Sequence, residues 1–244
     1  SSKQGNFQIL DIVEMLQPLT KYSKQLTHGK NASALFREAF RKAEEERPGV
    51  THIEIPEDVA QEKVEEIHVF AKVEPKIPTA NKKDIKKAAS IIAAAKQPLL
   101  LIGAGANRKR ASKALTTFVN ALQIPFFNTQ MGKGIIDERH ELYIGTAALS
   151  SEDFIHEAIE HSDLIINIGH DTIEKPPFIM NKDDKRKVIH INFFSTEVNE
   201  VYFPHHNVIG DIASTVKKLT NQLKKHAGKW DNDFYINIKQ KVNK

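Results

Sequence analysis

Between residues 98 and 211, six short apolar runs alternate with polar stretches of helical character. Strands that alternate with helices predict right-handed crossovers and a parallel sheet. The first and fourth runs are apolar throughout, which is typical of strands buried on both faces. The sequence therefore predicts an α/β fold, a doubly wound (Rossmann-like) six-stranded parallel sheet with helices on both faces. The runs are PLLLIG (98–103), IPFFNT (124–129), ELYIGTA (141–147), DLIINIG (163–169), KVIHINF (187–193) and NVIGD (207–211).

The stretches between these runs predict helices. Asn81 is expected to cap a helix that ends at Lys96, and Ser150 or Ser151 a helix that ends at His161. Two more helices are expected over 109–122 and 212–226. Upstream, apolar residues recur every three or four positions over 31–46, which predicts an amphipathic helix capped by Asn31.

The first 60 residues do not predict a complete domain. They supply one helix and the short alternating strand THIEI (51–55), which cannot bury their apolar faces alone. We therefore interpret residues 1–60 as a helix–strand remnant of another α/β domain. Residues 61–80, rich in charge and proline, are expected to form a linker, 81–226 the central domain, and 227–244 the start of a second linker.

Composition narrows the class of protein. The chain has no cysteine, which excludes disulfides and thiolate metal sites. The net charge of +4 is spread over helices and tails rather than gathered on a recognition motif, so we expect no nucleic-acid binding. No apolar run approaches the roughly 20 residues that span a bilayer, so no membrane partner is expected and the context reads as cytoplasmic.

Ligands of doubly wound sheets bind beyond the carboxyl ends of the strands, at the switch in strand order. Small or polar residues stand at all six predicted ends, where they let a ligand approach the backbone. These candidate cofactor-binding residues are, strand by strand, Gly103, Ala104 and Gly105; Thr129, Gln130 and Met131; Ile144 and Gly145; Gly169, His170 and Asp171; Asn192 and Phe193; and Gly210 and Asp211.

The first of these ends is the start of a dinucleotide fingerprint. Gly103 and Gly105 have the required spacing, but Arg108 stands where the third glycine is expected. Two interpretations stay open: the glycines contact a nucleotide, or they only let the chain turn after a buried strand. The loop Glu174-Lys175-Pro176-Pro177 is similarly either a turn, which we favour, or a lid.

No catalytic or metal-binding residue is predicted in this chain. There is no Gly-x-Ser-x-Gly elbow and no evident nucleophile–base pair. His190 lies inside an apolar run, as a hydrogen-bonded core residue would. His205 and His206 are adjacent and have no further partner at metal-ligand spacing.

Several segments of the chain follow, in order, the landmarks of one known enzyme family. RPGVTHIEIPEDV (47–59) resembles the end of the pyrimidine-binding domain of thiamine-diphosphate enzymes, and FQILDIVEMLQPLTKYS (7–23) resembles the preceding stretch of that domain in acetolactate synthases. LLIGAG, IPFFNTQMGKGIID, HSDLIINIG and VIHIN…VIGD follow in the order of that family's central domain. The resemblance covers nearly the whole chain.

This resemblance implies a carboligase that decarboxylates pyruvate and condenses the two-carbon unit with a second 2-oxo acid, in branched-chain amino-acid biosynthesis or an acetoin pathway. It implies thiamine diphosphate and Mg²⁺ held by residues outside this chain. The activating glutamate and the Gly-Asp-Gly motif of the family are missing, since Ile212 follows Gly210-Asp211. The fragment alone is therefore expected to be inactive and to carry structure or a nucleotide site.

The resemblance also implies FAD in the central domain, beside Gly103–Gly105, Thr129–Met131, Ile144–Gly145 and Gly169. Two departures disfavour FAD binding. The family has an arginine where this chain has Asp171, and a second arginine near the position of Ala34. The occupant is thus open between FAD, ADP and nothing, and we expect a well-formed cleft that is empty of FAD.

The expected partners are the remaining domains of the same chain, further copies in a homodimer or homotetramer, and a regulatory subunit. Two alternatives stay open: the central domain of another thiamine-diphosphate-dependent decarboxylase or oxidase, and a stand-alone nucleotide-binding module.

Overall fold

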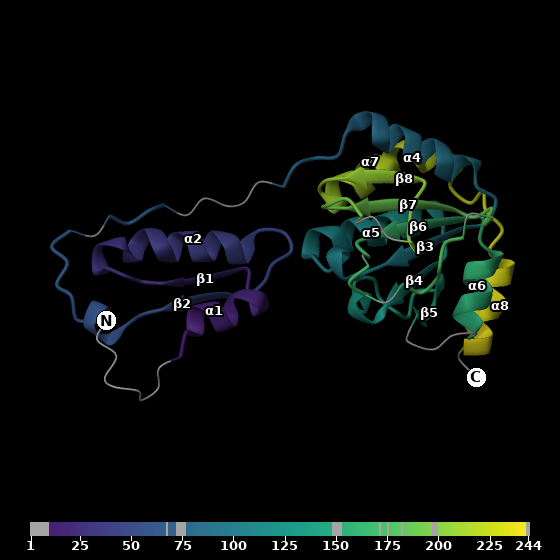
Figure 1. Ribbon diagram of the computed structural model, residues 1–244. Helices are drawn as coiled ribbons and strands as arrows, with labels where there is room; N and C mark the ends of the chain where they lie inside the picture. Colours follow the sequence, from purple (N-terminus) through teal and green to yellow (C-terminus); the bar gives the residue numbers. More distant parts are fainter. Residues whose placement is uncertain are drawn as a thin grey trace. The chain divides into compact units, whose positions relative to one another are not determined.

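The protein consists of two compact units, Ser1–Lys76 and Ile77–Lys244 (Figure 1). In the computed structural model, the described residues are 10–66, 68–71, 77–147, 153–170, 172–174, 176–181, 183–196 and 200–242. No helix among them is long and apolar enough to cross a membrane. In the same ranges, no group of three or more histidine and acidic side chains could hold a metal ion.

Unit 2, residues 77–244, contains the six-stranded parallel sheet that the sequence predicts. Its order is β5-β4-β3-β6-β7-β8, with every neighbouring pair parallel. All six apolar runs became strands, so the predicted fold class is confirmed. The strands are β3 (Pro98–Ile102), β4 (Phe126–Thr129), β5 (Tyr143–Ala147), β6 (Leu164–Ile168), β7 (Lys187–Asn192) and β8 (His206–Ile209).

Helices cover both faces of this sheet. Successive side chains of β3 point to opposite faces. Leu100 and Ile102 pack in one hydrophobic cluster, whereas Leu99 and Leu101 pack in the other. On the first face lie α4 (Lys82–Ala94), α5 (Lys109–Leu122) and α7 (Ile212–Leu223), and on the second lie α6 (Phe154–His161) and α8 (Asp233–Val242).

Helix α8 lies in the region that we expected to start a connector. It packs on α6 and β5, with Tyr235 and Ile238 buried. The indole N–H of Trp230 donates to Ala95 O at 3.0 Å, and Tyr235 Oη donates to Gln97 O at 3.2 Å. Unit 2 therefore extends past residue 226, through the short 3-10 helix η5 (Lys224–His226), to the end of α8.

The predicted helix caps had mixed outcomes. Asn81 Oδ1 accepts the Lys83 N–H at 2.9 Å, which confirms the cap of α4. For α6 the prediction of Ser150 or Ser151 is wrong, because Asp153 Oδ1 accepts the N–H groups of Ile155 and His156. The two serines lie outside the described residues.

Unit 1, residues 1–76, is built around a strand–helix–strand segment, β1 (Tyr22–Gln25), α2 (Ala32–Glu44) and β2 (Thr51–Glu54). The two strands pair in parallel, with Tyr22 opposite Thr51. Only the second strand could be predicted from the sequence, because YSKQ (22–25) is largely polar and has no apolar alternation. The short helices of this unit are α1 (Ile12–Leu16), η1 (Gln17–Leu19), η2 (Gly29–Asn31) and α3 (Glu57–Ala60).

The predicted cap of α2 is wrong. Asn31 has helical dihedral angles and its side chain makes no capping hydrogen bond. The 3-10 turn η2 leads the chain directly into the helix instead.

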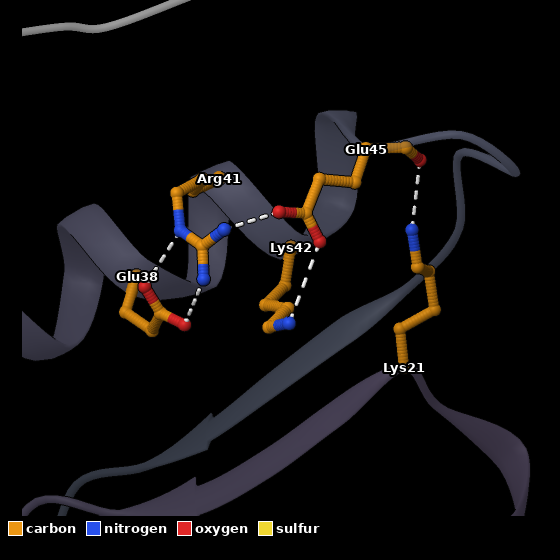
Figure 2. A network of polar contacts seen from close by, with 5 residues as sticks. All are labelled: Lys21, Glu38, Arg41, Lys42 and Glu45. Atoms are coloured by element: carbon orange, nitrogen blue, oxygen red, sulfur yellow. Dashed lines mark hydrogen bonds and ion pairs between the residues drawn. The ribbon is translucent and has the colours of Figure 1, made fainter. Parts of the chain in front are cut away.

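Polar contacts, rather than buried side chains, surround much of α2 (Figure 2). Arg41 bridges Glu38 and Glu45, and all three side chains are partly buried. Lys21 Nζ donates to Glu45 O at 2.8 Å and so joins the end of α2 to the start of β1. Among the described residues of unit 1, the buried hydrophobic side chains are Leu26, Ala39 and Val59.

Candidate functional site

The switch in strand order lies between β3 and β6. From β3 the chain builds β4 and β5 on one side, and from β6 it builds β7 and β8 on the other. Ile102 pairs with Ile168, so the loops that follow these two strands leave the sheet side by side. The structure thus brings the predicted residues Gly103–Gly105 and Gly169–His170 together at the position where open α/β sheets bind ligands.

These two loops pack directly against one another. A Cβ on residue 103 would lie 2.3 Å from His170 Cα, and one on residue 169 would lie 2.3 Å from Ala106 N. Gly169 also has a φ of +74°, which favours glycine. A Cβ on residue 105 would likewise lie 2.8 Å from Gly169 O, so the close approach of the two loops accounts for Gly103 and Gly105 without a nucleotide.

The backbone N–H groups of the loop after β3 are already hydrogen-bonded. Gly103 donates to Ile168 O at 2.9 Å, and Gly105 donates to Gly169 O at 2.7 Å. The N–H groups of residues 106, 107 and 108 donate to carbonyl oxygens within the loop itself. Phosphate-binding loops work by aiming free N–H groups at the anion. In this loop, five of the six N–H groups from residue 103 to residue 108 are bonded to carbonyl oxygens of the chain.

The sixth N–H group, that of Ala104, donates to a side chain. Its acceptor is Glu174 Oε1, at 3.0 Å, from the loop after β6. The other carboxylate oxygen, Oε2, accepts the Thr129 hydroxyl at 2.5 Å. Thr129 Oγ1 in turn accepts the Gly132 N–H at 3.2 Å, in the 3-10 helix η4 (Gln130–Gly132). One carboxylate therefore joins the loops that follow β3, β4 and β6.

The sequence predicted a turn at Glu174 but not this contact. The available signal was an acidic residue a few positions beyond β6, the strand that neighbours the glycine loop. The partner of that residue depends on how the loop folds back, which strand periodicity does not determine. Asp171 and Lys175 lie outside the described residues, so the predicted effect of the Asp171 charge stays a prediction.

Candidates at the other strand ends have structural partners. Asn192 is fully buried, and its Nδ2 donates to His170 O at 3.4 Å, while its Oδ1 accepts the Phe193 N–H. Asp211, just after Gly210, caps α7 by accepting the Ser214 N–H at 2.6 Å. Its second oxygen pairs with Arg110 at 3.1 Å. These residues organise the edge of the sheet and complete its hydrogen bonds.

Ile144 and Gly145 do not lie at a strand end. Both are buried inside β5, which runs on to Ala147, and Ile144 packs in the core on the α6 side. Gln130 and Met131 lie in η4 and are exposed, Met131 by 63%. The structure therefore does not gather all of the predicted site residues around one cleft.

Below the loops lies a buried polar cluster of Asn167, His190 and Tyr202. The Tyr202 hydroxyl meets Asn167 Nδ2 and lies 3.2 Å from His190 Nδ1. Burial raises the pKa of Tyr202, so its hydroxyl stays protonated at neutral pH. His190 Nε2 is 3.3 Å from Phe194 O, which confirms that His190 is a hydrogen-bonded core residue.

A cavity of about 780 Å³ opens near the amino ends of β6 and β7, opposite the carboxyl ends of the strands. It is lined by residues that precede β6 and β7, among them Glu160, Asp163, Asp184 and Arg186. Arg186 is already held by Asp184 at 2.6 Å and by Ile159 O at 2.7 Å. This cavity is thus remote from the carboxyl ends where the sequence placed the candidate site.

The diphosphate of a flavin does not fit the loop as it stands. An anion at this loop would need N–H donors, and the six N–H groups of residues 103–108 are all bonded within the chain. It would also face the Glu174 carboxylate across Ala104 N, where like charges repel. The residues present are therefore built for loop–loop packing rather than for a diphosphate.

A six-stranded parallel sheet with this order and two helical layers defines a doubly wound α/β domain of the Rossmann type. Residues 85–219 match the family model described as "Thiamine pyrophosphate enzyme, central domain". The chain belongs to this family of thiamine pyrophosphate enzymes.

Relatives of known name agree. The chain is 30% identical over 219 residues to "Acetolactate synthase" of Bacillus subtilis (strain 168), with 89% of this chain and 38% of that protein covered. It is 30% identical over 246 residues to "Probable acetolactate synthase large subunit" of Methanococcus aeolicus, with 97% of this chain and 39% of that protein covered. The chain thus spans about two fifths of the length of these relatives.

A solved structure shows the same fold. It is a "putative thiamin diphosphate-dependent enzyme" from Mycobacterium smegmatis, with a TM-score of 0.72 and 19% identity. The match covers 87% of this chain and 41% of that one.

Proposed function

We propose that this chain is the central segment of an acetolactate synthase. The observation that carries the proposal is the 30% identity, over 89% and 97% of the chain, to proteins named "Acetolactate synthase" and "Probable acetolactate synthase large subunit". The complete enzyme would decarboxylate pyruvate and join the two-carbon unit to a second 2-oxo acid. Thiamine diphosphate, held with Mg²⁺ by domains outside this segment, would supply the carbanion chemistry.

Within that enzyme the role of this segment is structural. At the carboxyl ends of the strands, Glu174 and Asp211 accept hydrogen bonds from the chain, and burial raises the pKa of Tyr202 and Tyr235 in the core of unit 2. A general base or nucleophile would need a group poised near the working pH. We therefore assign residues 81–226 and the packed helix after them to the domain that separates the two cofactor-binding domains.

We also propose that residues 1–60 complete another α/β domain. The parallel β1–β2 pair, with α2 between them in sequence, is one crossover unit of such a sheet. Exposed Phe36, Phe40 and Ile55 leave this unit with apolar surface to cover. That surface favours packing against the rest of a longer chain or against a further copy, in a homodimer or homotetramer, with a regulatory subunit as an additional partner.

An activity assay tests this proposal. The segment alone, supplied with pyruvate, thiamine diphosphate and Mg²⁺, is expected to form no acetolactate, whereas the complete protein forms it. Benzoylformate, an aromatic 2-oxo acid, serves as the matched substrate. If the complete protein turns over benzoylformate but not pyruvate, it is a different thiamine-diphosphate enzyme and not an acetolactate synthase. Turnover by the purified segment would place catalytic residues inside it and contradict the assignment.

A further inference from the structure

Glu174 stands out because its carboxylate occupies the place of a ligand. In a nucleotide-binding turn, the N–H groups that follow the first strand point at phosphate oxygens. Here the N–H of Ala104, the first residue of η3 (Ala104–Ala106), points at Glu174 Oε1. The donor is of the type that binds phosphate, and the acceptor is an anion supplied by the chain itself.

The second carboxylate oxygen shows how firmly this anion is held. Oε2 accepts the hydroxyl of Thr129, at the end of β4. Hydrogen bonds to an ionised acceptor are about twice as strong as those between neutral groups. A backbone N–H from one loop and a hydroxyl from another thus converge on the carboxylate, as they would on a phosphate group.

Two arginines next to the loop already have partners. Arg110, in the first turn of α5, pairs with Asp211 at 3.1 Å, and Arg108 Nη1 donates to Asn107 O at 3.1 Å. A nucleotide diphosphate approaching Ala104 would have to displace the carboxylate from two hydrogen bonds and then remain close to its charge.

We propose that Glu174 is a built-in anion for the loop after β3, and that it makes the switch point of this chain selective against phosphate-bearing nucleotides. The carboxylate closes the loop in the way that a bound phosphate would. The inference concerns ligand binding by this chain and does not depend on acetolactate formation.

The decisive variants are Glu174→Gln and Glu174→Ala, made in the full 244-residue chain. Glutamine keeps the shape and both hydrogen bonds, since its carbonyl accepts from Ala104 and its NH₂ donates to Thr129, but it removes the charge. Alanine removes charge and contacts together. Glu157→Gln is the matched control: it changes the net charge equally on α6, where Glu157 pairs with Lys241 at 2.9 Å.

Calorimetric titration with ADP, and with uncharged adenosine as the reference, gives the result. We expect the unchanged chain and Glu157→Gln to bind ADP too weakly to measure. Glu174→Gln and Glu174→Ala should each bind ADP at least tenfold more tightly than the control, with no gain for adenosine. In ¹⁵N–¹H spectra of Glu174→Gln, ADP should shift the Ala104 and Gly105 amides.

Four outcomes would overturn the proposal. Glu174→Gln that binds ADP no better than the control shows that the charge selects nothing, and this variant decides the question even where alanine disturbs the fold. If only Glu174→Ala binds ADP more tightly, the size of the side chain and not its charge limits binding. If the affinities for ADP and adenosine rise equally, the base and not the phosphate is being recognised. Tight binding of ADP by the unchanged chain removes the premise.

Discussion

The two parallel sheets of this chain differ in what holds them. In unit 2, all five residues of β3 and all five of β6 are buried, because helices cover both faces. In unit 1, all four residues of β2 are partly exposed, and only Ser23 of β1 is buried. The same strand–helix–strand arrangement is thus fully buried where six strands lie between two layers of helices, and it stays largely partly exposed where two strands pair beside short helices and α2.

The largest test of this comparison is to separate the units. Residues 77–244 expressed alone should unfold cooperatively on heating, because both hydrophobic clusters lie within them. Residues 1–76 alone should show little cooperative unfolding, since a two-stranded sheet is marginal in water. Thermal scans by circular dichroism and amide exchange distinguish the two.

Sedimentation adds a second measurement to the same pair. If unit 1 carries surface that needs a partner, the full chain should associate more strongly than residues 77–244. Two results together would contradict this difference between the units: residues 1–76 that unfold cooperatively in isolation, and a full chain that stays strictly monomeric.

A pair of phenylalanines sharpens the contrast in packing. Phe118 on α5 is fully buried, whereas Phe40 on α2 is 62% exposed. Phe118→Ala should lower the free energy of unfolding by about 3–5 kcal/mol through lost contacts and a cavity. Phe40→Ala should change it by less than about 0.5 kcal/mol. Urea unfolding of the full chain measures both, and a large loss at Phe40 would reveal a covering surface in solution.

Most of unit 2 could be predicted from the sequence, for a physical reason. A strand buried on both faces has to be apolar throughout, so a short apolar run in the sequence is enough to predict it. β1 was not predicted because YSKQ becomes a strand through pairing with β2, and its own residues show no strand pattern. The position of candidate residues at strand ends was predictable, but their partners were not. The Glu174 contact joins residues 70 positions apart, and no spacing rule reaches that far.

Helix caps provide a smaller comparison between the units. Asn81 accepts a hydrogen bond at the start of α4, while Asn31 makes none at the start of α2. Asn81→Ala should cost about 1 kcal/mol of stability, whereas Asn31→Ala should cost almost nothing. Amide exchange in the first turn of each helix is the most direct readout. Equal costs would mean that Asn31 has a partner in solution beyond its helix.

The smallest expected effect is electrostatic and confined to α2. The hydrogen bond from Arg41 lowers the pKa of Glu38 below its ordinary value of 4.5, and the charges of Arg41, Lys42 and Arg37 act in the same direction. A carboxylate whose pKa is lower in the folded state stabilises that state at pH values above its ordinary pKa. This contribution is lost as the pH falls below 4.5 and through the folded-state pKa. The same hydrogen bond raises the pKa of Arg41, so Arg41 stays charged throughout and adds no pH dependence of its own.

Amide protection of α2 should therefore decrease on acidification from pH 5, and Arg41→Gln should return the Glu38 carboxyl titration to its ordinary range. The magnitude is small because both side chains reach solvent. Helix α5 is the internal reference, since six buried side chains hold it in place. A Glu38 titration that Arg41→Gln leaves unchanged would show that the ion pair does not persist in solution. In that case α2 would depend on neighbouring surface even more than its sparse core indicates.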